Sequence, residues 1–122
     1  MEFTTALDHH LTTVRDRDLD AFMATVHTDA TFILPNGRVL EGADEIRAFH
    51  KGWFADPDWT MNTEVTRTLT QGDTAIVVLA VDYHDLDEDG KPYRLSYFLS
   101  LTFARATGDG DWLLLHDQNT NR

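Results

Sequence analysis

Cysteine is absent from this chain of 122 residues, and basic residues are scarce. Without cysteine there is no disulfide framework, no thiol nucleophile and no thiolate metal site, although histidine and carboxylate ligands remain available. Ten basic residues stand against 21 acidic ones, which gives a formal charge of −11. Because the basic residues form no cluster in the sequence, the chain should repel nucleic-acid phosphates and anionic membrane surfaces. We therefore expect neither nucleic acid nor membrane as a partner.

Long hydrophobic runs are also absent. The N-terminal sequence MEFTTALDHH lacks the cationic start and apolar core of a signal peptide, and no segment has the length needed to span a bilayer. These absences predict a cytoplasmic protein. The chain is long enough for one domain with a sizeable core and contains no repeat, linker or low-complexity run, so we expect a single domain over residues 1–122.

Apolar residues at helical spacing predict three helices in the first half of the chain. The first runs from Phe3 to Val14, the second follows a possible N-cap at Asp18 and extends to Val26, and the third covers residues 43–54. A short strand over residues 31–34 separates the second and third helices. It ends at a Pro-Asn-Gly turn, after which Gly42 allows the chain to bend.

The second half of the chain has the alternating pattern of β-strands. Four strands are predicted, separated by turns at residues 71–73, 87–92 and 107–111; they cover residues 59–70, 75–86, 93–106 and 112–120. Three helices against a curved antiparallel sheet make an α+β fold with the helices on one face. The run at residues 87–89 is acidic but lacks the spacing of a calcium loop.

Both faces of the strand at residues 75–86 are largely apolar. One face carries Ile76, Val78, Ala80, Asp82 and His84, which we interpret as inward, and the other carries Val77, Leu79, Val81 and Tyr83. A sheet with one solvated face should alternate cleanly between apolar and polar residues. A second apolar face therefore predicts a homodimer through the outer face of the sheet, built on Val77, Leu79 and Val81.

Several polar side chains fall on positions that we interpret as inward. His10 and His50 lie on apolar helix faces. Asp82 and His84 share the inward face of one strand, and His116 and Gln118 lie on the last strand. A carboxylate beside an imidazole is a common acid–base pair. The candidate catalytic residues are therefore Asp82, His116, His50 and His10. The alternative is a purely structural role, in which these histidines are hydrogen-bonded core residues and Asp82 lies at a solvated strand end.

Aromatic residues at inward positions could line a ligand pocket, although aromatics at such spacing commonly belong to the core. The candidate ligand-binding residues of this kind are Trp53, Trp59 and Tyr97, and His84 and Gln118 are further candidates for ligand binding. A histidine metal site formed by His10, His50 and His116 would be possible in principle, but no short ligand motif supports it. We expect no metal and no cofactor.

The segment DATFILPNGRVLEGADEI and the terminal WLLLHDQNT resemble the nuclear-transport-factor-2-like superfamily, and within it the SnoaL-like branch. Gln118-Asn119-Thr120 is most similar to uncharacterised SnoaL-like proteins encoded with enediyne and other polyketide pathways. The resemblance covers nearly the whole chain and implies a cone-shaped α+β barrel with an internal pocket, usually as a dimer. The superfamily includes isomerases, dehydratases, cyclases and plain binding domains, so fold does not decide function.

The steroid isomerases of this superfamily need a carboxylate base and hydrogen-bond donors for an oxyanion. By the resemblance, the position of the base is occupied here by Leu34, that of the donating aspartate by a residue near Leu99, and that of the tyrosine by His10. All three catalytic positions differ, which argues against a steroid isomerase. Leu34 and Leu99 are instead expected to line the pocket. The related dehydratases use histidine with aspartate, which resembles the polar set described above.

Three hypotheses about function follow. The first is a small-molecule-binding protein whose pocket receives an apolar or aromatic compound. The second is a cofactor-independent lyase, isomerase or cyclase that uses the histidines and Asp82. The third is a dimerisation module whose cone is filled by side chains. An open pocket favours the first two hypotheses over the third, and a pH–rate profile would separate the first from the second.

Overall fold

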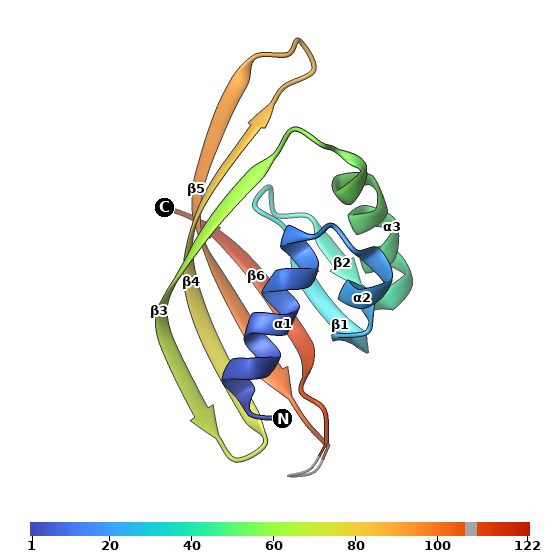
Figure 1. The fold of residues 1–122 in the computed structure, drawn as a ribbon, viewed down its shortest axis with the longest axis vertical. Coiled ribbons are helices and arrows are strands. Elements are labelled where there is room, and N and C mark those ends of the chain that lie inside the picture. The colour runs from blue at the N-terminus through green and yellow to red at the C-terminus, as the bar shows by residue number, and fades with distance from the viewer. Residues whose placement is uncertain (107–109) are drawn as a thin grey trace.

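The computed structural model of the protein describes residues 1–106 and 110–122 and confirms the predicted α+β class (Figure 1). The predicted loop at residues 107–111 lies partly outside the described residues. The described elements are three helices and six strands, in the order α1 (Phe3–Arg15), α2 (Leu19–Met23), β1 (Val26–Ile33), β2 (Val39–Glu41), α3 (Gly42–Ala55), β3 (Thr60–Gln71), β4 (Thr74–Leu86), β5 (Pro92–Ala104) and β6 (Leu113–Asn121).

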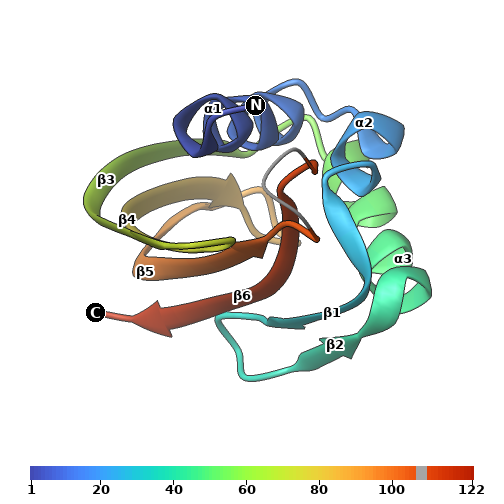
Figure 2. The ribbon, with the colours of Figure 1, turned by 90° about the horizontal axis from the view of Figure 1, so that it is seen from below.

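The six strands form one mixed sheet in the order β2-β1-β6-β5-β4-β3. Neighbouring strands are antiparallel except β1 and β6, which are parallel. The sheet curls strongly, and the three helices close its concave side (Figure 2). This arrangement leaves the concave face of β4, β5 and β6 directed toward α1 and α3.

Local signals explain where two of the helices begin. The Asp18 side chain accepts a hydrogen bond from the Ala21 backbone N–H at 3.1 Å, as expected for the N-cap of α2. Gly42, at the start of α3, has φ of +84°, a left-handed conformation that costs a residue with a Cβ free energy. The predicted extension of the second helix to Val26 is wrong, because α2 ends at Met23 and Val26, a β-branched residue, begins β1.

The core lies between the helices and the concave face of the sheet. Val77, Leu79 and Val81 are completely buried there, so the interpretation of these residues as the outer, dimer-forming face is wrong. The outer face of β4 instead carries Ile76, Val78, Ala80, Asp82 and His84. The prediction failed because both faces of β4 are apolar and alternation alone does not identify the inner one.

The convex face of the sheet keeps apolar side chains in contact with solvent. Ile76 is 40% exposed and Phe98, on the neighbouring strand β5, is 38% exposed. Ala80 lies opposite Phe98 in the β4–β5 register and also belongs to this outer face. In the part of the chain that the structure describes, no helix is both long enough and apolar enough to cross a membrane.

Candidate functional site

A pocket with a volume of about 330 Å³ lies inside the curl of the sheet, beneath the helices. This volume falls within the range of small-molecule sites. Most of the lining is aromatic or aliphatic; it consists of His10, Leu11, Val14, Phe22, Phe32, Leu34, Pro35, Asn36, Phe49, His50, Trp53, Met61, Tyr83, Tyr93, Leu95, Tyr97, Leu99, Asp117 and Asn119. Asn36, Tyr93 and Leu95 are exposed to solvent as well, and so mark the mouth of the pocket.

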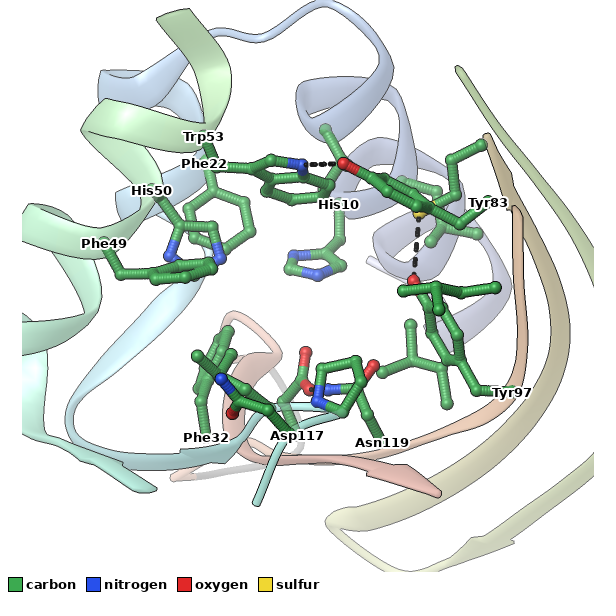
Figure 3. A pocket seen from close by; sticks show the side chains of 18 of the residues that line it. His10, Phe22, Phe32, Phe49, His50, Trp53, Tyr83, Tyr97, Asp117 and Asn119 are labelled. Carbon is green, nitrogen blue, oxygen red and sulfur yellow. Dashed lines mark hydrogen bonds between the residues drawn. The ribbon is translucent and has the colours of Figure 1, made fainter. Parts of the chain in front are cut away.

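Asp117 is the carboxylate inside this lining. Strand β6 pairs with β5 through Leu114 and His116 but contains one residue more between them, Leu115, which makes a β-bulge. The extra residue reverses the alternation of β6, so that Leu114 and Asp117 are both buried whereas Gln118 is exposed. Figure 3 shows Asp117 and Asn119 entering the pocket from the sheet side.

The carboxyl group of Asp117 has few polar neighbours. The residue is 8% exposed, and its Oδ1 accepts a hydrogen bond from Asn119 Nδ2 at 3.0 Å. Asn119 Nδ2 also donates to the Ile33 carbonyl at 2.8 Å, which holds the amide in place. Burial raises the pKa of Asp117 to about 7, and the hydrogen bond from Asn119 offsets only part of this effect. The group can therefore gain or lose a proton near neutral pH.

His10 reaches the pocket from α1 and has a defined tautomer. Its Nδ1 lies 2.7 Å from Thr25 Oγ1, and the Thr25 hydroxyl donates its own proton to the Phe22 carbonyl at 2.6 Å. Since that hydroxyl has no second proton, His10 Nδ1 must be the donor, which leaves Nε2 as an acceptor. Burial, with smaller contributions from nearby His50 and His9, lowers the pKa of His10 to about 3. The ring is therefore neutral near pH 7.

His50 follows the same pattern on α3. Its Nδ1 lies 2.6 Å from the Ile46 carbonyl, which can only accept, so Nδ1 carries the proton and Nε2 is again an acceptor. The ring stacks on Phe22 with centroids 4.4 Å apart. Burial lowers the pKa of His50 to about 4, although the bond to Ile46 acts in the opposite direction. His50 is thus a second neutral imidazole.

Aromatic side chains form the wall near the mouth. Trp53 stacks on Trp59 with ring centroids 4.5 Å apart and donates from Nε1 to the Tyr83 hydroxyl at 3.0 Å. The Tyr83 hydroxyl in turn donates to Asp85 Oδ2 at 2.8 Å, and burial together with Asp85 raises the pKa of Tyr83. This chain of hydrogen bonds fixes the positions of Trp53 and Tyr83.

Six residues predicted for the site do line the pocket. Two are histidines on helices, one is a tryptophan on α3, and three lie on or next to strands: His10, His50, Trp53, Tyr97, Leu34 and Leu99. Trp59 is buried but stands behind Trp53 rather than in the lining. These placements are structural, and the roles assigned to the residues remain predictions.

The inward placement of four other candidates is wrong. Asp82 lies on the outer face, where its Oδ1 accepts hydrogen bonds from Arg94 at 2.7 Å and from Ser96 at 3.0 Å. The hydrogen bonds from Arg94 and Ser96 lower the pKa of Asp82. His84 shares that face of β4 and is exposed.

His116 and Gln118 also stand outside the pocket lining. Their side chains approach each other at 3.5 Å, from His116 Nε2 to Gln118 Oε1. In their place the structure brings in Asp117, Asn119 and Tyr83, which the sequence reasoning missed. For β4 the sequence contained a usable signal, because the face with Val77, Leu79, Val81 and Tyr83 is the bulkier one. For β6 the sequence contained no signal of the bulge.

Potential metal ligands do not gather in the described structure. Over residues 1–106 and 110–122, no group of three or more histidine, aspartate or glutamate side chains is placed to hold a metal ion. The chemistry that the described pocket offers is therefore that of one carboxyl group, two imidazoles, two amides, tyrosine hydroxyls and aromatic faces.

Known structures share this fold. The chain is similar to a ketosteroid isomerase-like protein from Erwinia carotovora atroseptica (20% identity, TM-score 0.80, covering 97% of this chain and 92% of that one). It is also similar to an uncharacterised protein with a cystatin-like fold from Caulobacter vibrioides (18% identity, TM-score 0.81, covering 98% and 86%). A third is the CaMKII hub of S. rosetta (23% identity, TM-score 0.74, covering 98% and 93%).

At these identities the likeness shows the fold alone. No curated protein matches the chain. The sequence profile of the SnoaL-like domain, in contrast, matches residues 7–113, which is most of the chain and includes most of α1, all of α2 and α3, and strands β1 to β5. The protein therefore belongs to the SnoaL-like domain family.

Proposed function

We propose that the protein binds a small, largely apolar or aromatic organic molecule in the pocket beneath its helices. A cavity of about 330 Å³ supports this function over that of a domain whose interior is filled by side chains. Aromatic walls and a few fixed polar groups are the usual features of such sites. The resemblance of the C-terminal segment to proteins of polyketide pathways also supports an aromatic or polycyclic ligand.

Binding of a neutral fluorescent probe tests this proposal. N-phenyl-1-naphthylamine should bind saturably, with a change in its fluorescence and in that of Trp53, which lines the pocket. Leu99→Trp should block binding, because Leu99 is a buried lining residue and the larger ring would fill the cavity. Phe98→Trp places the same ring on the outer face of β5 and should bind normally. Saturable binding that survives Leu99→Trp would contradict the proposal.

A second candidate function is catalysis by Asp117, and one observation favours it. The carboxyl group lies in an apolar pocket and its pKa is raised to about 7, the range in which a general acid or base works best at neutral pH. This supports a cofactor-independent isomerase, cyclase or lyase with Asp117 in the role first assigned to Asp82 and His116. The steroid isomerase reaction is not proposed, because Leu34 and Leu99 leave its expected positions apolar.

Kemp elimination of 5-nitrobenzisoxazole measures such a base with a neutral aromatic probe. The carboxylate takes the C–H proton while the N–O bond breaks, and the product is a coloured phenolate. The rate should rise with pH around the pKa of Asp117 and be lost in Asp117→Asn. Asp82→Asn, which removes a carboxylate on the outer face, is the matched control. Equal rates for the two variants would exclude Asp117 as a base.

We also propose that the protein forms a homodimer through the convex face of the sheet. Exposed Ile76 and Phe98 lie on this face, and an apolar sheet surface in contact with water is commonly covered by a partner. The similar fold of a protein named as a hub supports self-association. Light scattering at micromolar concentration should show twice the mass of the chain.

A further inference from the structure

Apart from the exposed Asn36 amide at the mouth, the side-chain hydrogen-bond donors in the pocket wall are already directed to protein acceptors. Trp53 Nε1 donates to Tyr83, and the Tyr83 hydroxyl donates to Asp85. The hydroxyl of Tyr93, at the mouth, is directed to the same Asp85 carboxylate at 3.5 Å. The Tyr97 hydroxyl points to the sulfur of Met61 at 3.8 Å, which makes it the least firmly held donor.

The Asn119 amide is committed in the same way. Its Nδ2 donates both to the Ile33 carbonyl and to Asp117 Oδ1. An amide nitrogen has two protons, so these two bonds use both of them. A ligand that offers only acceptors, such as a ketone, therefore meets few free donors on this wall.

Several acceptors, in contrast, have no hydrogen-bond partner among the described residues. The tautomers argued above leave a lone pair on Nε2 of both His10 and His50. Asp117 Oδ2 has no donor among the described groups, since Asn119 bonds the other oxygen. Figure 3 shows these three side chains directed into one space from α1, α3 and β6.

The only side chain of the described lining that can be charged near neutral pH is acidic, Asp117. No lysine or arginine is among the described residues that line the pocket, and both imidazoles are neutral near pH 7. Asp117 is thus a buried carboxyl group without a cationic partner, and an ionised carboxylate in such surroundings favours a positive charge beside it. The faces of Trp53, Tyr83 and Tyr97 attract cations as well.

We propose that the ligand of this pocket is a small arylalkyl or alicyclic amine, bound as its ammonium ion, whose N–H groups bond Asp117 Oδ2 and an imidazole Nε2 while its rings pack on the aromatic wall. This inference rests on the proposed binding function and specifies the class of ligand. It excludes carboxylates and other anions, because the described lining offers them no cation.

Four compounds with one ring system separate the alternatives: 2-naphthylmethylamine, 2-naphthylmethanol, methyl 2-naphthyl ketone and 2-naphthoate. Calorimetric titration at pH 8 should show that the amine binds at least about tenfold more tightly than the alcohol, since charged hydrogen bonds are the stronger ones. The ketone should bind more weakly than the alcohol, and the naphthoate should not bind. A ketone or naphthoate as tight as the amine, or an alcohol equal to it, would overturn the inference while leaving the binding function intact.

Failure of all four compounds to bind would instead count against the binding function itself. The Asp117→Asn variant adds a test within the series: the amine should lose at least about tenfold in affinity, and the alcohol should change by less than about threefold. Asp82→Asn should bind all four compounds as the unchanged protein does, because Asp82 pairs with Arg94 on the convex face. An equal loss for amine and alcohol in Asp117→Asn would show that Asp117 shapes the pocket without recognising charge.

The pH dependence gives an independent readout. The ionised fraction of Asp117 rises from about a tenth at pH 6 to about nine-tenths at pH 8, so the affinity for the amine should rise about tenfold. His10 and His50 titrate well below this window, and the pKa values of Tyr83, Tyr93 and Tyr97 are raised, so these lining groups keep their charge. Asp85, beside Tyr83, has a lowered pKa and stays ionised. A flat profile in the unchanged protein would contradict the inference.

Discussion

Replacing Asp117 by asparagine should change how stability depends on pH. Asparagine keeps an oxygen that can accept from Asn119 but cannot ionise, so it imitates the protonated carboxyl group. The pKa of Asp117 is raised from 3.8 to about 7. With about 1.4 kcal/mol for each pKa unit, ionisation of this buried group costs the folded state roughly 4 kcal/mol at pH 8. The variant should therefore be more stable than the unchanged protein at neutral and alkaline pH.

The sign of the effect differs between the carboxyl group and the two imidazoles. Asp117 has a higher pKa in the folded protein than in the unfolded chain, so stability falls as pH rises from about 4 to about 7. His10 and His50 have folded pKa values of about 3 and about 4, below the ordinary 6.5. Their contribution to stability is therefore lost as the pH falls from the ordinary value of 6.5 toward these folded values. Between pH 4.5 and 6 the effect of the carboxyl group on stability therefore opposes that of the two imidazoles.

The linkage relation turns these signs into slopes. In the unchanged protein between pH 4.5 and 6, the unfolded state binds two more protons on the histidines and one fewer on the aspartate than the folded state does. The net difference is one proton, so these groups should make stability rise by about 1.4 kcal/mol per pH unit. In Asp117→Asn the difference is two protons, and the slope should be about 2.7 kcal/mol per pH unit. Other carboxyl groups contribute equally to both proteins and cancel in the comparison.

Urea unfolding measured at intervals from pH 4.5 to 8.5 provides the assay. The stability gained by Asp117→Asn should increase steadily up to about pH 7 and then level off. Asp82→Asn is the control, because Asp82 is paired with Arg94 and its pKa is lowered, so no gain should develop near neutrality. Parallel pH profiles for Asp117→Asn and the unchanged protein would refute the reasoning and imply that water or a counter-ion solvates Asp117.

Three further predictions concern other parts of the molecule. Thr25→Val leaves the buried Nδ1–H of His10 without an acceptor and should lower the free energy of unfolding by about 1–3 kcal/mol in urea titrations; no loss would contradict the hydrogen bond between His10 and Thr25. Gly42→Ala should cost about 1–2 kcal/mol, seen as a lower melting temperature, because φ is +84° while the nearest atom to the new Cβ, the Thr28 carbonyl oxygen, is 3.7 Å away. Phe98→Asp should yield monomers in sedimentation experiments, and a persistent dimer would place the interface elsewhere.

Helical spacing, strand alternation and turn residues were sufficient to predict the α+β class and the three helices, but not strand β2 or the full length of β1. His50 was placed inward because it shares a helix face with Ile46 and Phe54, and all three are buried in α3. The Asp18 cap and the bend at Gly42 follow from side-chain chemistry and backbone freedom, which act within a few residues. Signals of this range survive folding with little interference from the rest of the chain.

The candidate site was only partly predictable, because the inner face of a strand depends on distant packing. In β4 both faces are apolar, and the face chosen as inward carries Asp82 rather than Tyr83. In β6, unbroken alternation would place His116 and Gln118 on the same face as buried Leu114, but a bulge interrupts the alternation. Such a bulge arises from pairing with a neighbouring strand, and the residues of β6 themselves show no mark of it.

The bulge in β6 determines which reactive groups line this pocket. Leu115 is the residue by which β6 exceeds its neighbour β5 between Leu114 and His116. Without the bulge, unbroken alternation from Leu114 would turn His116 and Gln118 to the concave side and Asp117 and Asn119 to the convex side. One strand thus encodes two alternative linings, an acidic one and an imidazole one. A one-residue shift in the pairing of β6 with β5, without any change of sequence, would therefore give this scaffold a different chemistry.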